Sequence, residues 1–156
     1  SYSEPFMREA IRLSREKMEA GEGGPFGAVV VRGEKIVGSG WNRVTSANDP
    51  TAHAEIQAIR DACEKLDTFS LAGCEIYASC EPCPMCLSAI YWARLDTLYF
   101  AASRNDAAHA GFDDVLIYDE ISKPIMERKM RAEQHLQTAA QTVMASWRNK
   151  TNKKPY

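Results

Sequence analysis

The chain has 156 residues and a mass of 17.4 kDa, a size that suits one domain with a substantial hydrophobic core. Its composition, 45% hydrophobic and 26% charged, excludes disordered, collagen-like and coiled-coil chains. Lys and Arg number 19 against 21 Asp and Glu. The resulting net charge of -2 disfavours a nucleic-acid partner and favours a small substrate.

The N-terminal residues and the cysteines indicate in which cellular compartment the protein is expected. Charges at Glu4, Arg8 and Glu9 interrupt any apolar core of a secretory signal. The apolar runs elsewhere are far shorter than the ~20 residues of a membrane span. Three of the five cysteines fall within residues 80–86, which suggests reduced thiols and a metal rather than disulfides. We therefore expect a cytoplasmic protein with no membrane contact.

The first half of the chain predicts two helices and a hairpin. Apolar spacing favours a helix over residues 4–20, with Ser3 as its N-cap and glycines from residue 21 ending it. Residues 26–31 and 35–41 read as two strands joined by a turn at residues 32–34. After a polar loop at 42–48, Asp49 and Pro50 predict the N-cap and first turn of a helix over about 51–66.

The second half predicts two strands separated by a helix. Residues 74–79 and 97–102 read as strands, and Pro84 suits the first turn of a helix that ends near residue 93. Strands joined through a helix run parallel with a right-handed crossover, so we expect an α/β domain with a mixed central sheet. The spacing also predicts a helix over 133–147 and a basic tail over 148–156, while 105–118 carries no clear pattern. One domain is expected to span residues 1–156.

A metal-ligand pattern joins the two halves. His53 lies where the second helix begins, and Cys83 and Cys86 lie where the third begins. One imidazole and two thiolates are good zinc ligands, and three protein ligands leave a tetrahedral position open for water, as in catalytic sites. The partial positive charge at both helix N-termini favours the thiolate forms. The sequence therefore predicts one catalytic Zn²⁺ ion.

Glu55 follows His53 by two residues and is the predicted proton shuttle. It is too close in sequence to be a comfortable fourth ligand, yet near enough to take a proton from water on the metal, making zinc-bound hydroxide the nucleophile. The combination H-x-E with P-C-x-x-C is the signature of zinc nucleobase deaminases. Cys63, Cys74 and Cys80 are read as reduced, packed thiols.

Two other metal interpretations compete with this one. A C-x-x-C pair also occurs in structural zinc sites, in which a lone His is a cap and a lone Glu is a surface residue. Cys80, Cys83 and Cys86 also resemble part of an iron–sulfur run, but the later Cys-Pro is absent and His53 would have no role. The combined motif favours the catalytic site.

The glycine-rich residues 21–27 do not form a phosphate loop, because they follow a helix and precede a strand. They are instead expected to end the first helix and lead into the first strand. Phe26 and Trp92 are candidate walls for a flat ring substrate, with core packing as the alternative for each.

The motifs resemble a known family over nearly the whole chain. Residues 23–29, 48–55, 79–86, 89–94, 110–114 and the tail 152–156 are similar to those of the small bacterial guanine deaminases of the cytidine deaminase-like superfamily. The resemblance implies a three-layer αβα fold, one Zn²⁺ per subunit and usually a homodimer. It implies hydrolysis of guanine to xanthine and ammonia, with Glu55 carrying protons to the ring nitrogen and then to the departing amine.

The resemblance also implies the substrate contacts. Asn42 would hydrogen-bond the purine, the Ala54 backbone would contact it, and Phe26 and Trp92 would line it. Asp114 would accept hydrogen bonds from the N1 and N2 donors of guanine, a pairing that discriminates against rings without them. Tyr156 would cap the pocket of its own or a neighbouring subunit. A solvated loop acid and a frayed tail are the alternatives for these last two residues.

Three other functions remain as alternatives. A transfer-RNA adenosine deaminase shares the zinc motif, but it needs a basic face, and only 128–131 and 148–154 offer basic clusters. A cytosine-type deaminase would differ mainly in pocket size. A zinc-stabilised binding module is disfavoured by the open metal position and by Glu55.

Overall fold

The computed structural model describes all residues, 1–156, and divides them into two compact units. The first unit is Ser1–Asp114 and the second is Val115–Tyr156. All the candidate metal ligands belong to the first unit.

A four-stranded mixed sheet forms the centre of the first unit. Its strands are β1 (Gly27–Arg32), β2 (Lys35–Trp41), β3 (Glu75–Cys80) and β4 (Thr97–Ala102), in the order β2-β1-β3-β4. β1 is antiparallel to both of its neighbours, and β3 is parallel to β4. The predicted mixed sheet is confirmed, with strand limits that agree to within one residue.

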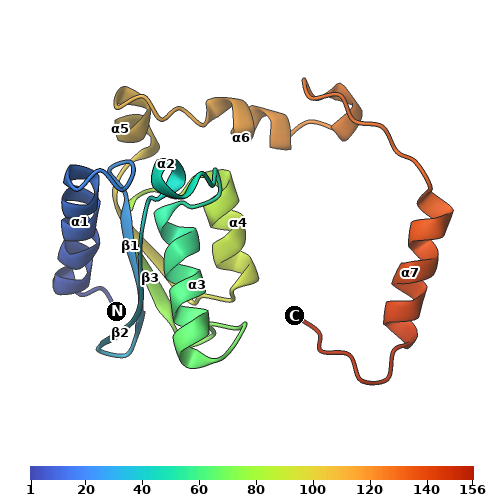
Figure 1. Ribbon diagram of the computed structural model, residues 1–156, viewed down its shortest axis with the longest axis horizontal. Helices are drawn as coiled ribbons and strands as arrows, with labels where there is room; N and C mark the ends of the chain where they lie inside the picture. Colours follow the sequence, from blue (N-terminus) through green and yellow to red (C-terminus); the bar gives the residue numbers. More distant parts are fainter. The chain divides into compact units, whose positions relative to one another are not determined.

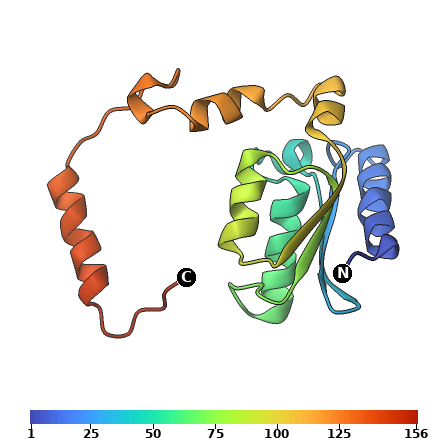
Figure 2. The ribbon, with the colours of Figure 1, turned by 180° about the vertical axis from the view of Figure 1, so that it is seen from behind.

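Helices cover both faces of this sheet (Figures 1 and 2). α1 (Glu4–Glu19) packs on one face, and α3 (Ala54–Leu66) and α4 (Pro84–Trp92) lie over the other. Side chains of β1 alternate between the two layers, with Val29 in the core beside α1 and Val30 in the core beside α3. The three-layer α/β prediction is therefore confirmed.

A glycine on β2 lets α3 approach the sheet closely. A Cβ atom at Gly40 would lie 2.3 Å from both the Ala54 carbonyl oxygen and the Ala58 nitrogen. No larger residue fits there without moving the helix. Gly40 thus determines how closely the start of α3, and the residue before it, pack against the sheet.

The predicted start of the second helix is wrong. Residues 44–47 form a short helix, α2 (Val44–Ala47), inside the expected loop, and α3 begins at Ala54 rather than near residue 51. Asp49 is not an N-cap, because its Oδ1 accepts hydrogen bonds from the Thr51 N–H and hydroxyl and closes a local turn instead. His53 is the N-cap residue of α3.

Three further differences are smaller. Ser3 is the N-cap residue of α1, but its side chain makes no capping hydrogen bond, and its backbone N–H instead donates to the Tyr77 hydroxyl at 2.9 Å. The unassigned stretch contains α5 (Arg104–His109) and α6 (Val115–Ile121). The C-terminal helix, α7, spans Gln137–Asn149, later than the predicted 133–147.

The second unit consists of α6, the 3₁₀ turn η1 (Ile125–Glu127), α7 and their connections. The Arg128 guanidinium ties part of it together by donating to the backbone carbonyls of Glu120 and Lys123. No residue of this unit is buried, although it carries many large apolar side chains. No helix of the chain has the length and apolarity that a bilayer crossing requires.

Strand directions bring four chain segments to one edge of the sheet. Because β2, β3 and β4 run the same way and β1 runs opposite, the ends of these three strands meet the start of β1. Two backbone hydrogen bonds join the segments there, from the Asn42 N–H to the Phe26 carbonyl and from the Glu81 N–H to the Ala102 carbonyl. In open α/β sheets, ligands bind outside such an edge.

Candidate metal centre and active site

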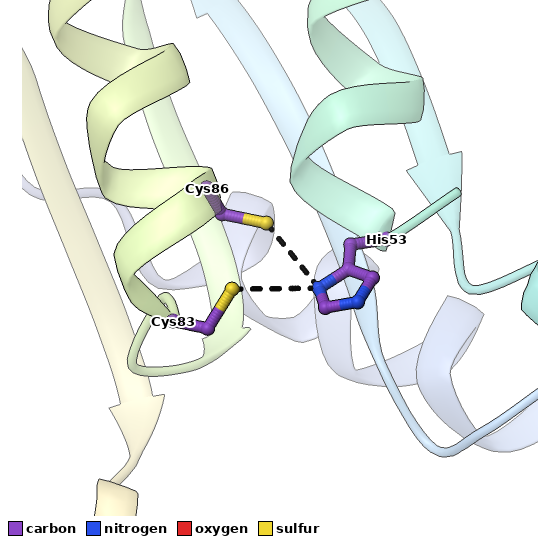
Figure 3. A group of neighbouring side chains, drawn as sticks. All are labelled: His53, Cys83 and Cys86. Atoms are coloured by element: carbon purple, nitrogen blue, oxygen red, sulfur yellow. Dashed lines mark hydrogen bonds between the residues drawn. The ribbon is translucent and has the colours of Figure 1, made fainter. Parts of the chain in front are cut away.

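Three side chains converge just beyond this edge (Figure 3). His53 is the N-cap residue of α3, Cys83 is the N-cap residue of α4, and Cys86 lies in the first turn of α4. The His53 Nδ1 atom lies 3.5 Å from the Sγ atom of Cys83 and 3.5 Å from that of Cys86. The structure therefore brings the three sequence-predicted ligands together, with ligand atoms all within 4.8 Å of one another.

This geometry suits zinc. Zinc–sulfur bonds of about 2.3 Å and zinc–nitrogen bonds of about 2.0–2.1 Å at tetrahedral angles separate the S and N atoms by about 3.5 Å. The observed separations of 3.5 Å match that value. The same comparison selects Nδ1, rather than Nε2, as the ligand atom of His53.

The pKa values of the two cysteine ligands are shifted in opposite directions. A hydrogen bond from the Cys86 thiol, assisted by His53, lowers the pKa of Cys83 to about 4. The same hydrogen bond, together with burial, raises the pKa of Cys86. Zinc binds both sulfurs as thiolates, so metal binding by this pair is linked to proton release.

Glu55 is held beside the ligands in an apolar setting. It lies in the first turn of α3, and only 7% of its surface is exposed. Burial raises the pKa of its carboxyl to about 7. A carboxyl that both accepts and releases protons near neutral pH has the property required of a proton shuttle.

Asn42 and Phe26 line the same edge. The Asn42 Oδ1 accepts hydrogen bonds from the Gly24 N–H at 3.3 Å and the Val44 N–H at 3.1 Å, and the side chain is 8% exposed. A Cβ at Gly23 would lie 2.1 Å from the Asn42 carbonyl oxygen, so glycine is required for this packing. Because Oδ1 is engaged, the Asn42 amide N–H₂ is the group left to meet a ligand.

Ala54 directly follows His53 and is fully buried. As the first residue of α3, it presents its backbone at the end of the helix where N–H groups have no partner within the helix. The structure therefore places Asn42, Phe26 and Ala54 around one end of the sheet together with the metal ligands.

Asp114 is half-buried and lies in the irregular segment 112–114 between α5 and α6. Its Oδ1 is 3.6 Å from the Arg104 Nε, and its side chain is 20% exposed. Phe112, in the same segment, meets Phe26 edge to face, with ring centroids 4.9 Å apart. Arg104 and Phe112 were not among the predicted site residues, although the position of Arg104 just after β4 indicated the same sheet edge.

Trp92 lies at the end of α4 that is away from the metal ligands. Trp92 is the last residue of α4, about 12 Å along the helix axis from the first residue, and 63% of it is exposed. Tyr156 is 76% exposed and belongs to the second unit. Their roles stay predictions.

A pocket of about 320 Å³ opens on the α1 side of the sheet. Its lining includes Ile11, Phe26, Cys80 and Ala107, but none of the three metal ligands. Burial raises the pKa of the Cys80 thiol to about 11, and this thiol donates a weak hydrogen bond to the Ser103 carbonyl. Cys80 is thus a packed thiol rather than a fourth ligand.

Comparison with known families identifies the metal region. Residues 1–102 match the model of the cytidine and deoxycytidylate deaminase zinc-binding region. The match contains the ligands and Glu55. It agrees with the 3.5 Å geometry and confirms zinc as the metal of this site.

Relatives match far beyond this region. Guanine deaminase of Bacillus subtilis is 52% identical over 153 residues, 98% of each chain. Its crystal structure superposes with a TM-score of 0.96 and 51% identity, covering 100% of this chain and 99% of that one. A guanine deaminase from Nitrosomonas europaea gives a TM-score of 0.68 at 36% identity, covering 73% of this chain and 66% of that one.

A different deaminase is also similar. The tRNA-specific adenosine deaminase of Aquifex aeolicus is 36% identical over 130 residues, 83% of each chain. The resemblance to bacterial guanine deaminases is confirmed over the full length. The chain is an enzyme and belongs to the cytidine and deoxycytidylate deaminase family of zinc-dependent deaminases.

Proposed function

We propose that this enzyme hydrolyses guanine to xanthine and ammonia. The observation that carries the proposal is similarity to the Bacillus subtilis guanine deaminase over 98% of both chains, including residues beyond the zinc region. The tRNA-specific adenosine deaminase of Aquifex aeolicus covers less of the chain at lower identity. The net charge of -2 also favours a free base over RNA.

In the proposed reaction the three ligands bind the metal, and Glu55 transfers the protons. His53, Cys83 and Cys86 would hold the zinc ion, which would supply Lewis-acid activation of the water molecule that attacks C2 of guanine. Glu55 takes one proton from the attacking water and passes it to the ring nitrogen. It then takes the remaining proton from the new C2 hydroxyl and gives it to the amine, which leaves as ammonia while the C2 carbonyl forms. Its raised pKa, about 7, keeps both directions of transfer accessible.

The remaining candidate residues hold the ring. Asn42 donates its amide N–H to a purine acceptor, the Ala54 backbone contacts the base, and Phe26 forms an apolar wall braced by Phe112. Asp114 accepts from N1–H and N2–H of guanine. These roles follow from the family resemblance and from the position of each residue at the sheet edge.

We also propose that the enzyme is a homodimer in which Trp92 and the tail ending at Tyr156 complete the substrate pocket. The absence of any buried residue in Val115–Tyr156, despite its apolar side chains, supports this, because such a segment gains its stability by packing on another surface. Light scattering during size-exclusion chromatography is expected to give twice the chain mass. A monomer at micromolar concentration would contradict the proposal.

A cytoplasmic location is proposed from the cysteines. All five are unpaired, and two are metal ligands that need a reduced state.

A substrate panel tests the activity. The zinc-loaded enzyme is incubated with guanine, adenine, cytosine, cytidine and an anticodon stem-loop RNA, and ammonia release is measured. We expect turnover of guanine at least a hundred-fold above that of the others, since a site that hydrogen-bonds its substrate rejects rings lacking those groups. Turnover of the stem-loop without turnover of guanine would replace the proposal with the tRNA-editing function.

A further inference from the structure

Arg104 is a charged residue for which the zinc motif provides no role. It begins α5, directly after β4, and its Nε lies 3.6 Å from the Oδ1 of Asp114. The two residues form an ion pair at the sheet edge where the metal ligands also lie, and both side chains are only partly exposed, 37% and 20%. Partial exclusion of water makes such a pair stronger than one on an open surface.

The backbone of Arg104 is held by the chain segment that leads to the cysteine ligands. Its backbone N–H donates to the Glu81 Oε1 at 3.1 Å, and the Glu81 N–H donates to the Ala102 carbonyl. Glu81 lies two residues before the ligand Cys83. A capping box between Ser103 and Asp106 further fixes the first turn of α5. The guanidinium therefore extends from a backbone joined to the loop that carries the cysteine ligands.

The segment 112–114, which carries Asp114, is fixed from the opposite direction. The Phe112 N–H donates to the Ala107 carbonyl, and the Phe112 ring packs edge to face on Phe26. The Phe26 carbonyl in turn accepts from the Asn42 N–H, next to β2. The backbone of this segment is thus held in place, and the ion pair places the Oδ1 of the Asp114 carboxylate beside the Arg104 guanidinium.

We propose that Arg104 is a positioning residue that orients the Asp114 carboxylate as the acceptor for the N1–H and N2–H groups of guanine. This inference rests on the proposed function. The guanidinium charge at 3.6 Å from Oδ1 favours the Asp114 rotamer that keeps this oxygen beside Arg104. In this role Arg104 acts through Asp114 rather than through the base.

A double-mutant cycle tests this. Arg104→Gln, Asp114→Asn and the double variant are compared with the wild type in kcat and KM for guanine. Loss of the ion pair in Arg104→Gln, or of the carboxylate acceptor in Asp114→Asn, is expected to lower kcat/KM by about 10–100-fold. Because Arg104 acts through Asp114, the double variant is expected to lie within about two-fold of Asp114→Asn alone. Arg104→Lys, which keeps the charge, is expected to recover part of the loss.

A matched control separates positioning from folding. Arg8 forms an ion pair of the same kind with Glu4 on the exposed surface of α1, so Arg8→Gln is expected to leave kcat/KM unchanged. Zinc content and Tm are measured for every variant. Arg104→Gln is expected to retain a full complement of zinc.

The outcomes distinguish the two proposals. If the zinc-loaded wild type does not turn over guanine, the proposed function fails and this inference fails with it. If the wild type turns over guanine but the Arg104→Gln and Asp114→Asn effects multiply in the double variant, or if Arg104→Gln leaves kcat/KM intact, only the role of Arg104 is overturned. Loss of zinc in Arg104→Gln that Arg104→Lys does not restore would also overturn it, by showing a structural role.

Discussion

The Nδ1 atom of His53 lies 3.5 Å from the Sγ atom of Cys83, although the two residues are 30 positions apart in the chain. Each caps a different helix, and the two helices lie on the same face of the sheet. The separation matches that of two zinc ligands in a tetrahedral site. The metal centre is therefore built by the packing of α3 and α4 rather than by one local loop.

Loss of one thiolate should remove the metal. Cys83→Ser is expected to lower the zinc content from about one ion per chain to less than about a tenth, because an alcohol is a much weaker zinc ligand than a thiolate. Atomic absorption of the dialysed protein measures this. Cys63→Ser is the matched control, since Cys63 lies on α3 outside the ligand group, and it should retain zinc. Equal loss in both variants would contradict the ligand assignment.

Replacement of Glu55, the proposed proton shuttle, should strongly lower turnover without removing the metal. Glu55→Gln keeps the shape of the side chain but cannot carry a proton, so kcat for guanine is expected to fall by about 10²–10⁴-fold at unchanged zinc content. Steady-state kinetics and metal analysis test the two parts. Glu64→Gln, on an exposed position of the same helix, should have no effect. A Glu55→Gln variant with more than a tenth of the wild-type kcat would exclude Glu55 as the shuttle.

The packed thiol of Cys80 should resist alkylation. Its raised pKa, about 11, leaves about one thiol in a thousand ionised at pH 8, against about one in ten for an ordinary thiol with a pKa near 9. Iodoacetamide is therefore expected to label Cys80 at least a hundred-fold more slowly in the folded protein than in denaturant, as followed by mass spectrometry of the peptides. Labelling at similar rates in both states would show that Cys80 is not packed as described.

The capping box of α5 gives a pH-dependent contribution to stability. Hydrogen bonds from the Ser103 backbone N–H and hydroxyl lower the pKa of Asp106 below its usual value near 3.8. Because the folded pKa is the lower one, the contribution is present above the unfolded pKa and is lost as the pH falls through the folded pKa. Asp106→Ala should lower Tm by about 2–4 °C at pH 7.

The difference should narrow as the medium becomes acidic enough to protonate Asp106 in the wild type. Thermal melts from pH 7 down to the acid limit of folding measure it. Asp119→Asn, on an exposed position of α6, should leave Tm unchanged at every pH. A gap between Asp106→Ala and wild type that grows on acidification would contradict the capping role.

The sequence by itself determined the strands and the zinc ligands, and it predicted Glu55 as the proton shuttle, because each has a local signature. Apolar runs bounded by turns identify strands within one residue, and H-x-E with P-C-x-x-C needs no distant contact to be recognised. The start of α3 was misplaced because Asp49 and Pro50 match the pattern of a helix start, while hydrogen bonds of Asp49 with Thr51 favour a turn instead. A helix N-terminus and a local turn share the same Asp-Pro sequence signal, and they differ in which backbone N–H groups the aspartate accepts from.

Only the tertiary structure decided how these local parts meet. The 3.5 Å ligand separations depend on Gly40, which lets α3 approach the sheet, and on the strand directions that bring the ends of β2, β3 and β4 to one edge. Arg104 and Asp114 also form their ion pair at this edge, and no sequence pattern around either residue predicts that pair. Contacts between separate elements depend on the summed packing of the whole core, so no short motif encodes them.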